Sequence, residues 1–321
     1  MGIKKNNEMG YCLLLILGLC LSSPLLILNK SNIVEAGKTQ AFLAASEDSL
    51  FRPIKKNNIE NLQLNASNAL SVLVDFEKNK DKILYAKNEN SPAPIASMSK
   101  LMTAIIAIEQ YDLEDDIIIN KENALALNKT GLNIKTGDRI SLNNLLQIML
   151  IESNNAAAEA LTQKMGRDNF IAEMNKKSKD LGLINTIFYN PSGLDISDAI
   201  FNISTPKDLE KIAVYIIQKQ PLIGDICSIE QIDVYVNGKL LKHLENTNIL
   251  LKSSSDYLWG KTGYTEEANG CIILILKRPF SNIKESSNTY IINIIMGADG
   301  KINRFLEAQK MENWIINSFI W

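Results

Sequence analysis

The chain has 321 residues, enough for one large domain or two small ones, and its 46% hydrophobic and 22% charged residues are ordinary for a globular protein. Its formal net charge of −2 supplies no basic surface, which excludes nucleic acid as a partner.

The first 36 residues are predicted to direct export. Lys4 and Lys5 precede an uncharged apolar run, Tyr11 to Leu28, which is the arrangement of a secretory signal or of an N-terminal membrane anchor. The run is at the lower limit for crossing a bilayer, which needs about 20 residues. Val34 and Ala36 occupy the two positions that a signal peptidase reads, so we expect cleavage after Ala36, with a retained anchor as the alternative. In both cases the rest of the chain is expected in the periplasm or on the outer face of the cytoplasmic membrane.

A linker is expected over residues 37–64 and one globular domain over residues 65–321. The domain begins with a β-hairpin, Ala69–Phe76 and Ile83–Tyr85, on either side of a polar turn. A helix then starts near residue 97 and ends near residue 111, because apolar residues recur there at helical spacing. The middle of the chain is expected to hold a strand at Ile117–Ile119, a turn-rich segment at Asn128–Ile140, and helices at Leu142–Ile151, Ala156–Met165, Asn169–Leu181 and Pro206–Gln218.

The last third of the chain changes to strands. Ile232–Val236 and Lys239–Leu241 flank Asn237-Gly238, a strong hairpin signal. Further strands are expected at residues 259–265, 271–277 and 290–296, followed by an amphipathic helix from Arg304. Strands at both ends and helices between them predict an α/β fold, in which one antiparallel sheet is flanked by helices and the middle forms an inserted all-helical lobe.

Histidine and cysteine chemistry is restricted by the sequence. Cys12 and Cys20 lie in the apolar run, which leaves Cys227 and Cys271 as expected small buried residues. A Ser-His-Asp site would have to use the single histidine, His243, and a zinc site would lack ligands. We therefore expect no metal and no cofactor, and a serine hydrolase with this sequence would need lysine as its base.

Ser97 and Lys100 form such a pair. Pro92 and Pro94 keep the preceding chain extended, and Ser97 stands in the first turn of the expected helix, where free backbone N–H groups favour negative charge. Lys100 projects from the same face, within reach of the serine hydroxyl. A second Ser-x-x-Lys, Ser281–Lys284, lies in a polar segment with no helical face.

Two more motifs accompany this pair. Ser153-Asn154-Asn155 stands at a break between two expected helices, where polar groups point into a cleft. Lys261-Thr262-Gly263 stands at the start of a strand, where the glycine leaves room for a ligand against the backbone. Each motif has copies elsewhere in the chain, and their order and setting select this combination.

The longer strings around these motifs, Pro94–Ala104, Tyr189–Asp195 and Lys261–Ala268, resemble the D-alanyl-D-alanine carboxypeptidases, which are low-molecular-mass penicillin-binding proteins. The resemblance covers residues 69–319, nearly all of the exported part. It implies a β-lactamase/transpeptidase-like fold and a serine-type carboxypeptidase that removes the terminal D-alanine from peptidoglycan stem peptides through an acyl-enzyme.

The resemblance also implies roles for the motif residues. Ser97 would be the acylated nucleophile and Lys100 its neutral base. Ser153 would relay a proton to the leaving D-alanine, and Asn155 would orient Lys100 and the substrate amide. On the strand, the side chains of Lys261 and Thr262 would hold the terminal carboxylate beside Gly263. Backbone N–H groups of Ser97 and Tyr264 would form the oxyanion hole.

The implied partners are a peptidoglycan pentapeptide ending in D-Ala-D-Ala and, as covalent inhibitors, β-lactams. A D,D-endopeptidase or a β-lactamase of the same fold is an alternative, and so is a catalytically silent wall-binding protein. A β-lactamase of this type needs a carboxylate for its deacylating water, and none stands out. The sequence departs from the family pattern at Asn154, where glycine or aspartate is usual, and at Asn269. Many relatives continue into a β-rich domain and a C-terminal anchor, whereas this sequence ends at Trp321. We therefore expect any membrane attachment of this chain to be N-terminal.

Overall fold

The computed structural model describes residues 53–197, 199–254, 256–277 and 288–321. The expected export segment, most of the expected linker and the second Ser-x-x-Lys at residues 281–284 lie outside the described residues. The chain divides into two units, residues 56–319 and a remainder formed by 1–55 with 320–321. The described part of the remainder includes β1 (Ile54–Lys55) and the end of β13 (Phe319–Ile320).

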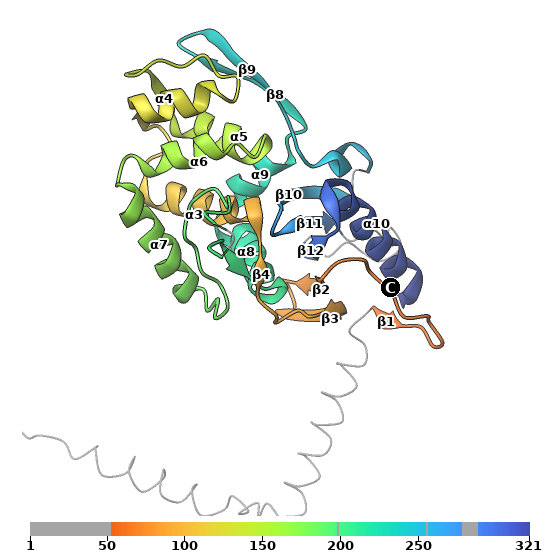
Figure 1. Cartoon of the computed structure of the whole chain (residues 1–321). Helices are drawn as coiled ribbons and strands as arrows, with labels where there is room; N and C mark the ends of the chain where they lie inside the picture. The colour runs from red at the N-terminus through yellow and green to blue at the C-terminus, as the bar shows by residue number, and fades with distance from the viewer. Residues whose placement is uncertain (1–52, 198, 255, 278–287) are drawn as a thin grey trace, which may run out of the picture. The chain divides into compact units, whose positions relative to one another are not determined.

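A five-stranded antiparallel sheet forms the centre of the larger unit (Figure 1). Its strands, in spatial order, are β10 (Tyr257–Thr265), β11 (Asn269–Lys277), β12 (Thr289–Ala298), β2 (Asn68–Asp75) and β3 (Lys80–Lys87). The N-terminal hairpin therefore joins the C-terminal strands, with Val72 opposite Ile292. This is the sheet expected from the sequence.

Helices cover both faces of the sheet. Every residue of β2 is buried, which requires protein on each side. On one face lies α10 (Gly300–Ser318), whose Phe305 and Met311 are buried. The opposite face carries α3 (Lys100–Gln110), α8 (Pro206–Lys219) and α9 (Pro221–Ser228) (Figure 1).

The middle of the chain forms the expected lobe, which is mostly helical but also contains a small two-stranded sheet, so it is not all-helical. Its elements are β5 (Asp116–Ile118), α4 (Lys121–Asn128), β6 (Arg139–Ser141), α5 (Leu142–Ile151), α6 (Asn155–Thr162) and α7 (Arg167–Asp180). Ser141 caps α5 by accepting a hydrogen bond from Asn144 N at 3.2 Å, which fixes where that helix begins. Within the described residues, no helix is both long and apolar enough to cross a membrane.

Two helices were not expected from the sequence. The apolar pattern of α4 is weak, but Asn120 caps its start by accepting from Asn123 N at 2.8 Å. In α9 the internal Gly224 reads as a helix breaker in the sequence. The structure gives it a packing role, because a Cβ atom there would lie 2.9 Å from Trp259 Nε1.

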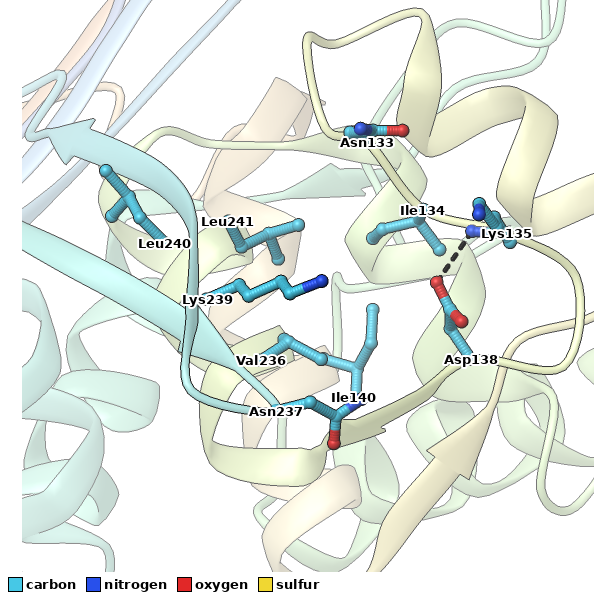
Figure 2. A pocket seen from close by; sticks show the side chains of 10 residues that line it. All are labelled: Asn133, Ile134, Lys135, Asp138, Ile140, Val236, Asn237, Lys239, Leu240 and Leu241. Carbon is cyan, nitrogen blue, oxygen red and sulfur yellow. Dashed lines mark hydrogen bonds between the residues drawn. The ribbon is translucent and has the colours of Figure 1, made fainter.

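The predicted hairpin around Asn237-Gly238 forms, but it stays outside the central sheet. Within the described residues, β8 (Gln231–Val236) and β9 (Lys239–Glu245) pair only with each other, and few of their residues are buried. The tip of the hairpin and residues 133–140 of the lobe enclose a pocket of about 310 Å³ (Figure 2). The smaller elements are β4 (Ala93–Pro94), which pairs with β7 (Ile203–Ser204), and the 3₁₀ turns η1 (Ala96–Ser99) and η2 (Ile249–Lys252).

Candidate active site

Ser97 lies in the 3₁₀ turn η1, immediately before α3, where its side chain is half-buried. The sequence placed it in the first turn of the α-helix, so the helix begins three residues later than expected. Gly193 packs closely against the backbone of this turn. Its φ is +81°, and a Cβ atom there would lie 1.9 Å from the carbonyl oxygen of Ala96, so only glycine fits.

Lys100 is fully buried, and its Nζ atom is surrounded by oxygen atoms. It lies 2.7 Å from Ser97 Oγ, and it donates to Asn155 Oδ1 at 2.6 Å and to the carbonyl oxygen of Ser192 at 2.5 Å. Sequence spacing predicted the contact with Ser97. The contact with Ser192 was not predicted, although the string that contains this residue was part of the resemblance.

The electrostatic environment favours an uncharged Lys100. Burial lowers the pKa of Lys100 well below its usual range, and the nearby positive charge of Lys261 lowers it further, while Glu159 acts in the opposite direction. A lysine whose pKa is lowered in this way can accept a proton from a serine hydroxyl.

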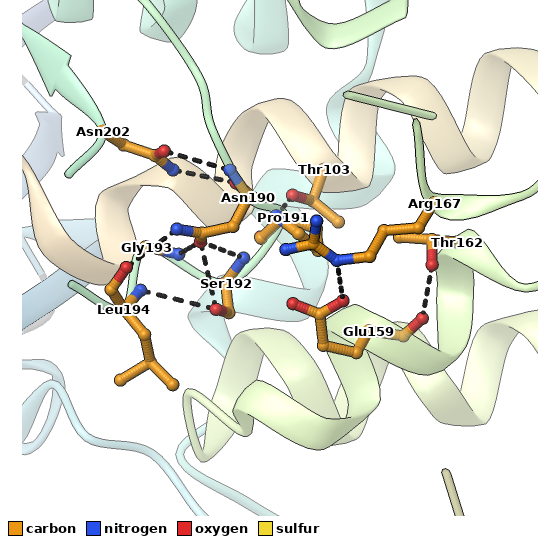
Figure 3. Close-up of polar contacts among 10 residues, drawn as sticks. All are labelled: Thr103, Glu159, Thr162, Arg167, Asn190, Pro191, Ser192, Gly193, Leu194 and Asn202. Atoms are coloured by element: carbon orange, nitrogen blue, oxygen red, sulfur yellow. Dashed lines mark hydrogen bonds and ion pairs between the residues drawn. The ribbon is translucent and has the colours of Figure 1, made fainter. Parts of the chain in front are cut away.

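The loop that presents Ser192 is fixed by a dense set of hydrogen bonds (Figure 3). Asn190 Oδ1 accepts from the backbone N–H groups of Ser192 at 3.1 Å and Gly193 at 2.6 Å. Asn202 Nδ2 donates to the carbonyl oxygen of Asn190 at 2.9 Å, and Thr103 Oγ1, from α3, donates to that of Pro191 at 2.6 Å. The acceptor for Lys100 is therefore held by both the loop and the helix that carries the lysine.

The break between α5 and α6 carries Ser153, whose φ of 62° lies in the left-handed region. The next residue, Asn154, caps α6 by accepting from Ala157 N at 3.0 Å, and its Nδ2 atom donates to Thr130 Oγ1 at 2.8 Å. An asparagine in place of the usual glycine or aspartate thus serves both as a helix cap and as a tie to the segment after α4. Asn155 begins α6 and reaches Lys100.

Lys261 is the second buried cation of the site, on strand β10. Its Nζ atom donates to Ser153 Oγ at 2.9 Å and to the carbonyl oxygen of Thr262 at 3.2 Å. Burial lowers its pKa to about 8, with a further lowering by the charge of Arg304. Thr262 Oγ1 lies 2.7 Å from Thr247 Oγ1, so a hydroxyl pair stands beside the cation.

Gly263 brings this strand against the serine. A Cβ atom at Gly263 would lie 2.9 Å from the carbonyl oxygen of Ile95 and 3.1 Å from the backbone nitrogen of Ser97. Arg304 Nη1, from α10, donates to the carbonyl oxygen of Gly263 at 3.0 Å. Tyr264 follows on the strand, with its half-buried side chain 3.4 Å from Glu266. The three sequence motifs therefore meet at one place.

The histidine and the two cysteines make none of the hydrogen bonds described above. His243 is exposed on β9, and its Nδ1 atom lies 2.7 Å from Asp233 on the neighbouring strand. Cys227 and Cys271 are buried free thiols, and burial raises their pKa values to about 12 and about 11. Neither thiol is poised for reaction at neutral pH.

Asn155 lines two pockets. One, of about 520 Å³, lies between α4, α6 and the Ser192 loop, and Ser192 and Leu194 are among its lining residues. The other, of about 420 Å³, opens beside Ser153. The lining of this second pocket consists of Thr130, Glu152, Ser153, Asn154, Asn155, Glu245 and Thr247.

The sequence is similar to a known protein family and to individual members of it. A family model described as D-alanyl-D-alanine carboxypeptidase, of the Peptidase S11 group, matches residues 55–300. The D-alanyl-D-alanine endopeptidase of Haemophilus influenzae is 36% identical over 217 residues, which are 66% of this chain and 71% of the relative. The enzyme of the same name from Escherichia coli is 29% identical over 250 residues, 76% of each chain.

The fold of this chain is also similar to that of a solved structure. A Listeria monocytogenes penicillin-binding protein with bound ampicillin superposes with a TM-score of 0.66 at 29% identity, over 80% of this chain and 99% of that one. The similarity supports the β-lactamase/transpeptidase-like arrangement of sheet and helices that the sequence predicts.

Proposed function

Because the chain belongs to the D-alanyl-D-alanine carboxypeptidase family of penicillin-binding serine hydrolases that act on the cell wall, we propose that it is a D,D-endopeptidase of peptidoglycan. An endopeptidase cuts the bond between a D-alanine carbonyl and an amine of a second stem peptide. The similarity to two D-alanyl-D-alanine endopeptidases over most of their length carries this choice. The sequence motifs favoured the carboxypeptidase instead, which remains the second candidate because the family description names that activity.

Acylation follows from the geometry around Ser97. The Ser97 oxygen attacks the D-alanine carbonyl carbon while its proton passes to the neutral Nζ atom of Lys100, 2.7 Å away. The resulting oxyanion accepts hydrogen bonds from the backbone N–H groups of Ser97 and Tyr264. Loss of one such donor typically costs about 10²–10³ in rate.

The leaving amine departs on the side of Ser153. Ser153, whose hydroxyl lies 2.9 Å from Lys261 Nζ, relays the proton held by Lys100 to the leaving nitrogen as the carbon–nitrogen bond breaks, which leaves Lys100 neutral again. Lys261 and Thr262 bind the carboxylate next to that nitrogen. With a pKa of about 8, Lys261 stays mostly protonated at neutral pH and keeps its charge for this task. Water then attacks the ester and gives one proton to Lys100, which passes it to the Ser97 oxygen as the ester bond breaks.

The same acyl-enzyme makes the protein a target of β-lactams, as expected from the sequence. The Listeria relative was solved with ampicillin bound. We expect the β-lactam carbonyl to be attacked by Ser97, and its carboxylate to be held by Lys261 and Thr262.

Two substrates test the choice between the candidate functions. Purified protein is incubated with a cross-linked stem-peptide dimer and, separately, with a pentapeptide ending in D-Ala-D-Ala. Conversion of the dimer to monomers supports the endopeptidase. Release of D-alanine from the pentapeptide without dimer cleavage would establish the carboxypeptidase, and no turnover of either substrate would support the silent wall-binding alternative. The Ser97→Ala variant is the control for both reactions.

The substrate requires a location outside the cytoplasm, so we retain the proposal of export to the periplasm or the outer face of the cytoplasmic membrane. Mass-spectrometric mapping of the mature N-terminus distinguishes cleavage after Ala36 from a retained anchor. A mature chain that begins near residue 37 in the soluble exported fraction supports cleavage. One that begins at Met1 in the membrane fraction supports the anchor.

A further inference from the structure

The pocket of about 420 Å³ beside Ser153 has walls from three separate segments. The turn between α5 and α6 supplies Glu152 and Ser153, the segment after α4 supplies Thr130, and the chain at and after the end of β9 supplies Glu245 and Thr247. We call this the Ser153 pocket.

The walls of the Ser153 pocket are tied together by hydrogen bonds. Lys242 Nζ, from β9, donates to Glu152 Oε2 at 2.7 Å and to the carbonyl oxygen of Thr130 at 2.8 Å. Thr247 N donates to the carbonyl oxygen of Ile151 at 3.0 Å. The hydrogen bonds of Lys242 and Thr247 therefore join the hairpin to the lobe, and the pocket does not need a ligand to form it.

The pocket begins where the leaving amine is released. Ser153 is the proposed proton donor to that amine, and Thr247 contacts Thr262 in the proposed carboxylate site at 2.7 Å. If the leaving residue is D-alanine, only a methyl group extends from the carbon that bears the carboxylate. A pocket at this place has room for a much longer residue.

The lining indicates what such a residue offers. All the side chains that line the Ser153 pocket are polar, and two of them are carboxylates, which accept hydrogen bonds. The charge of Glu152 is balanced by Lys242 at 2.7 Å, whereas Glu245 makes no ion pair within the described residues. The pocket therefore favours a chain with N–H donors, such as the amide groups of a peptide.

On the basis of the proposed function, we propose that the Ser153 pocket binds the leaving stem peptide of a cross-link, with Glu245 as an acceptor for its N–H groups. The pocket would thus favour cross-linked peptides over peptides that end in D-alanine. Glu245 would act as a specificity residue and not as a catalytic one.

The proposal is tested by a substitution whose larger side chain fills the Ser153 pocket. Glu245 is exposed at the end of a hairpin strand, so Glu245→Trp should fold, which thermal unfolding checks. We expect it to lower kcat/KM for the cross-linked dimer about tenfold more than for the pentapeptide, because only the dimer carries a long leaving group. Glu245→Gln keeps the size and one acceptor, and we expect it to lower the ratio of dimer to pentapeptide kcat/KM less than Glu245→Trp does.

The matched control is His243→Trp. His243 lies two residues away on the same side of the same strand, is also exposed, and does not line the pocket. We expect this variant to change neither rate. An unchanged ratio of dimer to pentapeptide kcat/KM in Glu245→Trp, with an active wild-type endopeptidase, would overturn the pocket assignment and leave the proposed function intact. A wild-type protein that cleaves only the pentapeptide would overturn both.

Discussion

The Nζ atom of Lys100 lies 2.5 Å from the carbonyl oxygen of Ser192, which comes from a loop 92 residues further along the chain. This oxygen accepts hydrogen bonds but cannot donate one. The same is true of Asn155 Oδ1, the second neighbour of Nζ, at 2.6 Å. A neutral amine has two hydrogens and one lone pair. When both hydrogens are donated to these oxygens, the lone pair is left for the hydroxyl of Ser97, as a general base requires.

The first prediction is that a fluorescent penicillin labels the protein covalently at Ser97 alone. Ser97→Ala should lose the label, because no other serine of the site has a neutral amine to take its proton. Lys100→Ala should lose it as well, with Ser97 still in place. Denaturing gels and mass-spectrometric mapping of the labelled peptide measure this. A label that survives Ser97→Ala would show that another nucleophile reacts, and Ser281 would be the next to map.

A second prediction concerns Gly193, which packs against the turn that carries Ser97. Gly193→Ala should destabilise the protein and lose penicillin labelling, because the new Cβ atom would lie 1.9 Å from the carbonyl oxygen of Ala96. The left-handed backbone alone costs about 1–3 kcal/mol for a non-glycine residue.

Gly137→Ala is the matched control for Gly193→Ala. Gly137 has a similar φ of +89°, but nothing lies within 4 Å of a Cβ atom there. It should show the backbone cost without loss of labelling. Thermal unfolding and penicillin-labelling rates of the two variants separate the cost of the left-handed backbone from the clash with Ala96. Equal losses of stability and labelling in both variants would contradict the packing role of Gly193.

The sequence predicts contacts between candidate side chains where those contacts are local. Ser97 and Lys100 are one helical turn apart, so their contact follows from spacing. The contribution of Ser192 cannot be read in this way, since every residue has a carbonyl group. Its position depends on hydrogen bonds to Asn190 and Asn202, which only the folded loop brings together.

The same distinction holds for the fold. The central sheet follows from apolar, β-branched strands such as β2 and β11, which are buried on both faces. The hairpin of β8 and β9 has an equally clear turn signal, but the turn does not determine which sheet the strands join. Helix α9 was missed because Gly224 looks unfavourable for a helix until Trp259 is packed against it.

A third prediction separates the base from the binding cation. Lys261→Ala should raise the pKa of Lys100, because a like charge that lowers it has been removed. A smaller fraction of Lys100 is then neutral at a given pH, so the acid limb of the pH–rate profile for penicillin acylation moves to higher pH. Binding of the carboxylate should weaken as well, which higher ligand concentration offsets. Labelling rates measured across pH at saturating penicillin test the shift, and an unmoved acid limb would show that Lys261 does not tune Lys100.

The last prediction concerns a substitution that shifts the pKa of Lys100 in the opposite direction. The charge of Glu159 raises the pKa of Lys100, although its Oε2 atom accepts a hydrogen bond from Arg167 Nε at 3.0 Å (Figure 3). Glu159→Gln should therefore lower the pKa of Lys100, so that acylation persists to lower pH. The shift should be smaller than that of Lys261→Ala, since Lys261 has the larger effect. Asp168→Asn, which removes an exposed carboxylate next to Arg167 in the sequence, is the control and should leave the profile unchanged. A Glu159→Gln profile whose acid limb moves to higher pH would contradict the electrostatic account of Lys100.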